Sequence, residues 1–460
     1  MEHQEPMSNA KIRLLQAAIS NFVITQPPPR LPLVNDEVSA WYAKHGIVFH
    51  YGFYDDGRAY GFNAEGAKAI GGLADALLAE QPTWRAGTRW LTLATAIAKS
   101  IHVTPSPQAT QTDLGRLEDA ITEWFIEQTI DRTFLIPCAI LPGPATAFSI
   151  GAAHFLSLRD LAAREGVTAQ QLLDHPDYHG LIETMHGRSA SWLAEVEVRG
   201  LDESVGSERA NLAVDVALVA VQMSLPLFHS REIARITGRT MPPFVGTIYT
   251  TRRHVHSGLH WRDPGLGVSV ATFDQLLSAS RSLVESIGRR VSGYLYGAQV
   301  LPRLEQAWCD GAFWLHEGLA EPLSTVAVAK LETAVEVLLS AESTKKSSPR
   351  FRAAFESFYG LKPDDPIAPN NPQTVNRLIA SIVGARSRVL HGTASTLSPD
   401  ISRGEQDSRL VIEMLAMDLI RRFTLALDTY AQNPTAIDDT ETFLAWINQQ
   451  RLTNPPQKIL

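Results

Sequence analysis

The sequence predicts an α+β N-terminal region followed by an all-α helical bundle. Two observations favour this fold class. Over about the first 270 residues, β-prone runs alternate with helical patterns, whereas from Phe273 onward the apolar residues recur only at helical spacing. The chain has 460 residues, of which 45% are apolar, so it has material for more than one packed core. We expect the α+β region at 1–270, divided near 145 if it holds two subdomains, and the helical region at 271–460.

The first region opens with an amphipathic segment and a proline-rich stretch that cannot be helical. Two β-prone runs then flank Asp56-Gly57, a dipeptide typical of a hairpin turn. The remaining patterns predict helices at 10–22, 64–80, 112–128 and 207–223, and strands at 132–141, 192–199, 247–251 and 268–272.

The second region consists of successive helical patterns without a comparable strand pattern. These patterns predict helices at 273–287, 304–319, 326–339, 375–391 and 410–430, separated by turn-rich spacers at 343–349 and 361–372. Such a run of helices is typical of a bundle.

Composition excludes several classes of protein. The net charge of −8 argues against binding of nucleic acid by the whole surface, so any contact with RNA or DNA would need a local basic groove. The two cysteines have no disulfide or zinc spacing, which favours a reducing cytoplasm. We see neither a signal sequence nor a membrane-spanning apolar run, and no P-loop, dinucleotide-binding or nucleophile-elbow motif. We therefore expect a cytoplasmic protein without membrane contact.

Two clusters of histidine and arginine allow alternative interpretations. His175, His179 and His186, with Asp174 or Asp177, have the residue types of a metal site but not its usual spacing. Pro176 and Gly180 interrupt the segment, so we expect a polar loop and no metal.

The second cluster is Arg252-Arg253-His254-Val255-His256, with His260 and Trp261 close behind. Cations beside aromatic rings suit a nucleic-acid backbone and its bases, which makes Arg252 and Arg253 candidates for substrate binding. The alternative is a solvated strand with one charged face.

A third pattern ends the helix expected at 375–391, where Arg386 and His391 are separated by four residues and Gly392 follows as a C-terminal cap. About one such spacing is expected by chance, given the numbers of Arg and His, so the context matters more than the pattern. Histidine titrates near neutrality and serves as base or acid, whereas arginine stays charged and binds two phosphate oxygens.

The context resembles the HEPN superfamily, and specifically the HEPN domain of ApeA-like phage-defence proteins. Ala385-Arg-Ser-Arg-Val-Leu-His-Gly392 is similar to that family's signature, and the upstream run AVEVLL, with Glu336 inside it, is similar to its acidic helix. The likeness covers about 307–430. It implies an endoribonuclease with Arg386 and His391 as catalytic residues and Ser387 as a supporting polar group. Arg388 is either a phosphate contact or a solvated side chain.

Residues five apart on a helix differ by about 140° around its axis, so Arg386 and His391 do not share one narrow face. The resemblance implies that two HEPN modules pair and that the Arg386 and His391 residues of both chains meet in one composite cleft. We expect a homodimer that pairs through 375–391 and its neighbour 326–339.

The sequence thus predicts a metal-independent HEPN-type endoribonuclease with an RNA substrate, acting in anti-phage defence under a phage-derived trigger. No cofactor is expected. The alternative is a non-catalytic HEPN dimerisation or binding module whose N-terminal region senses a phage protein or a nucleotide.

Overall fold

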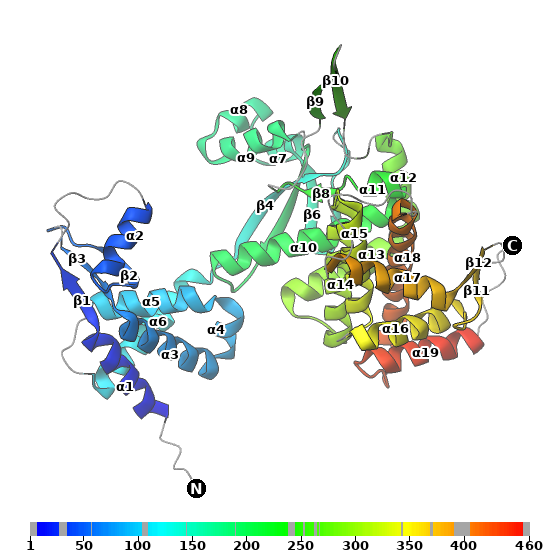
Figure 1. Ribbon diagram of the computed structural model, residues 1–460. Coiled ribbons are helices and arrows are strands. Elements are labelled where there is room, and N and C mark those ends of the chain that lie inside the picture. Colours follow the sequence, from blue (N-terminus) through cyan, green and yellow to red (C-terminus); the bar gives the residue numbers. More distant parts are fainter. Residues whose placement is uncertain are drawn as a thin grey trace, which may run out of the picture. The chain divides into compact units, whose positions relative to one another are not determined.

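The computed structural model describes residues 7–26, 35–56, 58–103, 109–143, 145–188, 190–237, 244–251, 254–261, 265, 267–341, 344–368, 371–390 and 405–453. The chain forms two compact units (Figure 1). The first contains residues 1–132 and 198–208, and the second contains residues 133–197 and 209–460. The change of pattern that the sequence places at 271 therefore falls inside the second unit.

The first unit combines a small antiparallel sheet with a layer of helices. The sheet has the order β1-β3-β2, with β1 at Phe22–Thr25, β2 at Phe49–Phe53 and β3 at Ala59–Phe62. Its helices are α1 (Met7–Ser20), α2 (Asn35–Lys44), α3 (Ala64–Glu80), α4 (Pro82–Gly87), α5 (Trp90–Val103) and α6 (Gln111–Gln128). The hairpin expected around Asp56 is confirmed by the antiparallel pairing of β2 and β3, and helix 64–80 is confirmed in full as α3.

The helices of the first unit enclose an aliphatic core. Apolar residues of α3 and α5 recur every three or four positions and are fully buried, among them Ile70, Leu73, Leu93 and Ile97. The helix α3 begins at the cap Asn63, whose side chain accepts a hydrogen bond from the Gly66 amide.

The second unit contains a five-stranded sheet with the order β5-β6-β7-β4-β8. The strands are β4 (Arg132–Ala139), β5 (Phe148–Ile150), β6 (Ala153–Ser157), β7 (Trp192–Val198) and β8 (Ala234–Arg235). The helices that follow these strands in sequence are α7 (Leu158–Arg164), α8 (Ala169–Asp174), α9 (Pro176–Gly187), α10 (Glu203–Ser224) and α11 (Leu227–Ser230). The strands expected at 132–141 and 192–199 are confirmed as β4 and β7.

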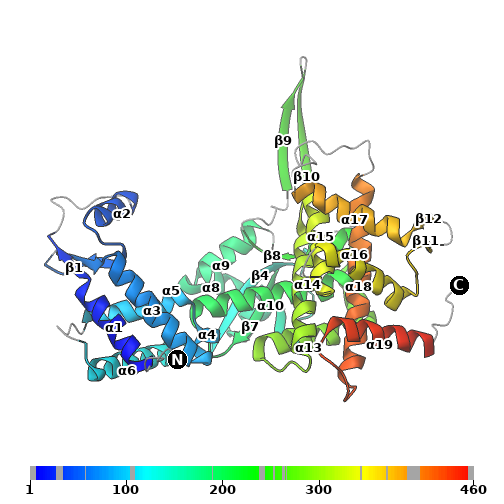
Figure 2. The same cartoon turned by 60° about the horizontal axis from the view of Figure 1, so that its bottom comes forward.

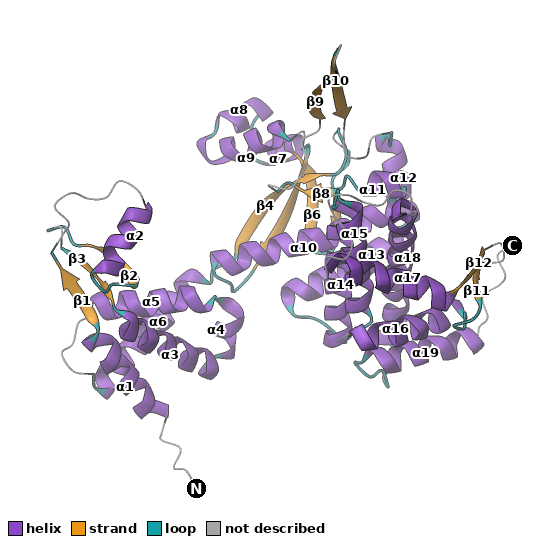
Figure 3. Cartoon of the chain, viewed as in Figure 1, coloured by secondary structure: helices purple, strands orange, loops and turns teal. Residues whose placement is uncertain are grey.

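The helical bundle of the second unit follows a separate two-stranded sheet (Figure 3). That sheet consists of β9 (Phe244–Thr250) and β10 (Val255–Trp261). The bundle contains α12 (Val270–Ala279), α13 (Arg281–Tyr296), α14 (Pro302–Ala320), α15 (Ser324–Leu338), α16 (Thr344–Ala354), α17 (Val375–Leu390), α18 (Glu405–Ala431) and α19 (Thr440–Thr453). Phe355–Tyr359 continues α16 as a π-helical turn, and β11 (Pro366–Ala368) pairs with β12 (Asn371–Thr374).

Helix α15 lies at the centre of this bundle, between α14, α17 and α18 (Figure 2). Ten of its fifteen residues are buried and none is exposed. The buried carboxylates of Glu332 and Glu336 on α15 must therefore be compensated inside the protein.

Three predictions about local structure are wrong. The segment 268–272 is not a strand, because Ser269 caps the start of α12 and accepts a hydrogen bond from the Thr272 amide. Of the spacer expected at 343–349, residues 344–349 belong to α16, which retains Pro349 inside the helix while Phe351 is fully buried. The helix expected at 273–287 is two helices that meet at Ser280.

A buried polar network joins the sheet to the bundle. Both oxygens of Asp215 on α10 accept hydrogen bonds from Arg235 of β8, at 2.7 and 2.8 Å. The imidazole Nε2 of His316 on α14 lies 3.5 Å from the same carboxylate. Burial lowers the pKa of His316, so the network holds a neutral imidazole beside one arginine–aspartate pair.

In the part of the chain that the structure describes, we find no helix with both the length and the apolar character needed to cross a membrane. Cys138 and Cys309 are both buried and unpaired with each other, as their spacing predicts. Burial raises the pKa of both thiols, that of Cys309 to about 12, so neither is a ready nucleophile.

Candidate active site around Arg386

Arg386 lies near the end of α17, on the side that packs against α15. The helix begins after Thr374, whose hydroxyl accepts a hydrogen bond from the Arg377 amide. Val375, Leu378, Ile379 and Ile382 are buried at helical spacing, and Arg386 follows Ile382 by one turn on the same stripe. The packing of the apolar face thus directs the arginine toward the bundle.

The guanidinium of Arg386 lies close to the carboxylates of two glutamates on α15. The Nη1 atom of Arg386 lies 2.5 Å from Oε2 of Glu336, and its Nε lies 3.6 Å from Oε2 of Glu332. Glu332 and Glu336 are separated by four residues, so both project from one face of α15. The Arg386 side chain keeps 23% of its surface exposed, whereas the side chain of Glu332 has no exposed surface.

The two glutamates differ in their hydrogen bonding. Glu336 also accepts a hydrogen bond from the Ser347 hydroxyl of α16. Neither carboxylate oxygen of Glu332 has a hydrogen-bond partner among the described residues. Burial, and then the negative charge of Glu336, raises the pKa of Glu332 to about 8, although Arg386 opposes this shift.

The cluster is therefore electrically balanced at neutral pH. A protonated Glu332 carries no charge, so the positive charge of Arg386 is compensated by Glu336 alone. An arginine in this state is held in a fixed orientation, but it needs a further cation nearby to attract a phosphate strongly.

The structure brings together only part of the set that the sequence predicts. Arg386 meets Glu336, the acidic residue of the AVEVLL run. Ser387 is half-buried on α17 beside it. Arg388 lies in the last turn of α17, where its side chain is not described. His391, Arg252 and Arg253 lie outside the described residues.

Glu332 and Ser347 are the members of the cluster that sequence reasoning missed. An available signal was the pair of acidic residues four apart within STVAVAKLETAVEVL, an otherwise almost entirely apolar or small helix. Ser347 gave no signal, because it falls in the segment that was expected to be a turn.

The histidines at 175–186 do not form the polar loop that their sequence predicts. Pro176 occupies the first turn of α9, where a missing amide costs nothing, and Gly180 lies inside this helix. His175 caps the helix and His179 lies 3.3 Å from Glu183. Throughout the described residues we find no group of three or more His, Cys, Asp or Glu side chains arranged to hold a metal ion.

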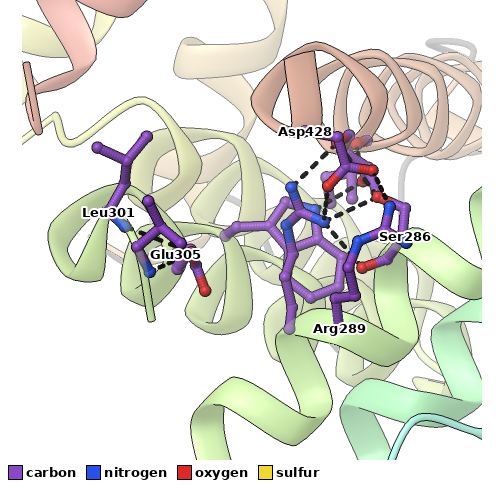
Figure 4. Close-up of polar contacts among 10 residues, drawn as sticks. Ser286, Arg289, Leu301, Glu305 and Asp428 are labelled. Atoms are coloured by element: carbon purple, nitrogen blue, oxygen red, sulfur yellow. Dashed lines mark hydrogen bonds and ion pairs between the residues drawn. The ribbon is translucent and has the colours of Figure 1, made fainter. Parts of the chain in front are cut away.

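A second charged cluster lies at the contact of α13 with α18 (Figure 4). The guanidinium of Arg290 is buried and donates hydrogen bonds to Asp428, Ser286 and the Thr424 carbonyl, while Arg289 pairs with Asp428 from the solvent side. Burial by itself would raise the pKa of Asp428, but its hydrogen bond from Ser286 and the charges of both arginines lower it.

This α13–α18 cluster borders a cleft of about 930 Å³. Glu305 lies on another wall of the cleft, where its carboxylate accepts hydrogen bonds from the amides of Val300 and Leu301. Both arginines thus share the single carboxylate of Asp428, and the cluster fastens α13 to α18.

Comparison of the chain with protein-family models, with curated proteins and with solved structures gives no match in any of the three. The likeness to the HEPN superfamily therefore rests on the motif residues themselves.

Proposed function

We propose that the chain is a metal-independent endoribonuclease of the HEPN type. The observation that carries this proposal is the placement of Arg386. It is held by Glu336 in the helical bundle, it keeps part of its side chain exposed, and the sequence puts His391 five residues further on. A positively charged group held in a fixed position suits the stabilisation of a phosphorane.

In this proposal His391 takes the proton of the RNA 2′-hydroxyl or returns one to the leaving 5′-oxygen. Arg386 and Ser387 hold the phosphate, while Arg388, Arg252 and Arg253 extend the contact along the RNA. The 2′-oxygen attacks the adjacent phosphorus, the bond to the 5′-oxygen breaks, and the product ends in a 2′,3′-cyclic phosphate. No metal is needed for this step.

The charge balance of the cluster supports a dimeric site. Since Glu336 compensates Arg386, this pair supplies little net positive charge, and a second chain would bring its own Arg388 and His391 to the same cleft. We further propose that the protein acts in the cytoplasm, in anti-phage defence, with the N-terminal region responding to a phage-derived trigger.

One observation favours a second candidate, a non-catalytic HEPN dimerisation or binding module. The ion pair between Arg386 and Glu336 is mostly buried, and such a pair also serves to fix one helix against another. In that case the N-terminal region would recognise a phage protein or a nucleotide.

The substitution His391→Ala separates the two candidates. We expect RNA cleavage to fall by about 10²–10⁴-fold while the melting temperature stays unchanged. Cleavage at the wild-type rate by the folded variant would exclude His391 from catalysis. A wild-type chain that binds partners but never cleaves RNA would favour the non-catalytic module.

A further inference from the structure

The strands β9 and β10 form a ribbon that projects from the second unit in both views (Figures 1 and 2). They pair antiparallel along their whole length, with Tyr249 opposite His256 and Thr250 opposite Val255. A ribbon of two strands has no core of its own, so its exposed side chains are available to a partner.

One face of this ribbon carries aromatic rings. The rings of Tyr249 and His256 are stacked, with centroids 4.8 Å apart and planes 11° apart. His254 lies on the same face and approaches His256 edge-on, with a centroid distance of 6.2 Å. Tyr249 is 59% exposed, so this short stack of rings ends on an open tyrosine.

The opposite face carries two exposed aliphatic side chains. Side chains alternate between the two faces of a strand, which places Ile248 and Val255 away from the Tyr249–His256 stack. Both are strongly exposed, Ile248 at 76% and Val255 at 72%. The two faces therefore provide a matched pair of positions, one aromatic and one aliphatic, on the same strand.

The charge of the ribbon segment is complementary to a polyanion. The sequence from Phe244 to Trp261 contains two arginines, three histidines and no Asp or Glu, in a chain whose net charge is −8. The turn closes where the Thr251 amide donates to the His254 carbonyl at 2.8 Å. The two residues between them in sequence are Arg252 and Arg253, which lie outside the described residues.

We infer that the ribbon binds single-stranded RNA. An unpaired base stacks on the face of the Tyr249 ring that does not contact His256. Aromatic platforms beside cations bind single strands with little regard to sequence, because every base has a flat face to offer. A duplex keeps those faces within its own base stack. The choice of RNA as the ligand rests on the proposed function, but the ribbon can bind a single strand whether or not the chain cleaves it.

The test is a binding measurement on the full chain carrying His391→Ala, so that RNA stays intact. The probe is a fluorescein-labelled oligouridylate of about 12 nucleotides, a length within the site sizes of such proteins, alone or annealed to oligoadenylate. We expect Tyr249→Ala to weaken binding of the single strand about tenfold, the scale of one lost base stack, and Tyr249→Phe to bind like the parent. The annealed probe should bind more weakly than the single strand.

Ile248→Ala is the matched control, since it removes an equally exposed side chain from the other face. It should leave the affinity unchanged. An equal loss in Ile248→Ala and Tyr249→Ala, accompanied by a change of oligomeric state in sedimentation, would make the ribbon a contact between chains and overturn the inference. Equal affinity for the annealed probe would overturn it as well.

The inference and the proposed function fail separately. A wild-type chain that never cleaves RNA, while its His391→Ala form binds the single strand through Tyr249, leaves the ribbon site standing and removes the nuclease. A chain that cleaves RNA, while Tyr249→Ala alters neither its affinity nor its KM, removes the ribbon site alone.

Discussion

Arg386 of α17 and Glu336 of α15 form an ion pair of 2.5 Å that joins the motif helix to the central helix of the bundle. The residue expected to bind phosphate is thus also a structural contact, and loss of activity on its removal has two explanations. Stability and activity must be measured together at this position.

Arg386→Ala should therefore destabilise the fold, because it leaves Glu336 buried without its cation. Breaking a buried pair in this way costs about 3–5 kcal/mol, and we expect the lower end because Arg386 is 23% exposed. Chemical denaturation measures the change. Adding Glu336→Gln should restore part of the lost stability, and strictly additive effects of the two substitutions would show that the pair is not coupled.

Glu332 makes stability depend on pH in a defined direction. Its pKa is about 8 in the folded chain against an ordinary value of 4.5, so the folded state holds the proton more tightly than the unfolded state. The resulting stabilisation is complete below pH of about 4.5, declines as the pH rises, and is lost above about 8. Each unit of pKa difference corresponds to about 1.4 kcal/mol.

Glu332→Gln should remove this dependence, because an amide does not titrate. We expect the melting temperature of the variant, relative to wild type, to rise between pH 5 and 8. Glu321→Gln is a control on the same side of the bundle, where Lys330 already compensates the carboxylate at 2.9 Å. A constant difference between wild type and Glu332→Gln across this range would contradict the shifted pKa.

Much of the bundle could be predicted because its helices bury one regular apolar stripe each. The helix expected at 375–391 agrees with α17, whose buried residues recur every three or four positions. The start of α16 could not be predicted, because Pro349 and the serines around it indicate a turn, whereas burial of Phe351 and the hydrogen bond from Ser347 to Glu336 favour the helix.

The candidate site was predictable only in part, because tertiary packing also decides which side chains face one another. Arg386 and Ser387 could be selected from the motif, since the chemistry of RNA cleavage needs such residue types. Glu332, the neighbour of Arg386, could not be selected, because nothing in the local sequence distinguishes a glutamate that faces the core from one that faces water. That distinction depends on the rotation of α15 between its neighbours, which is set by tertiary packing.

Gly288 should tolerate no side chain, because α13 touches the β5–β6 turn at this point. A Cβ added at Gly288 would lie 2.5 Å from the backbone nitrogen of Gly151, which itself has a positive φ of 58°. We expect Gly288→Ala to lower the free energy of unfolding by about 1–3 kcal/mol. A Cβ at Gly293 on the same helix would lie 3.2 Å from the flexible Gln299 side chain and 3.4 Å from Oε2 of Glu305, so Gly293→Ala should cost much less than Gly288→Ala.

Cleavage should continue in EDTA and should leave DNA intact, because the 2′-hydroxyl is the proposed nucleophile and no metal takes part. The products of a labelled RNA, treated with phosphatase before and after acid, reveal whether their ends are 2′,3′-cyclic phosphates. An all-deoxy strand of the same sequence is the control. Strict dependence on Mg²⁺, or cleavage of the deoxy strand, would assign the activity to another site.

Activity should also follow the concentration of dimer, since residues five apart in a helix differ by about 140° around its axis, and the sequence expects Arg386 and His391 in one helix. The sequence assigns two helices to the pairing surface. Of these, α15 has no exposed residue among those described, whereas Arg377, Ala380 and Ser381 of α17 are exposed, so we expect the chains to pair through α17. Identical chains would pair these surfaces about a two-fold axis. Cleavage rates measured across the dissociation range, beside sedimentation, test this dependence.

Mixing an Arg386→Ala chain with a His391→Ala chain then identifies the composition of each site. If each site takes Arg386 from one chain and His391 from the other, a mixed dimer contains one intact site, and activity returns in part. If each site needs both residues from both chains, every mixed dimer stays impaired. Because Glu336 compensates the Arg386 of its own chain, a site with a single Arg386 needs further positive charge, for which His391 and the arginines between β9 and β10 are the candidates. Full activity from a monomer would contradict both arrangements.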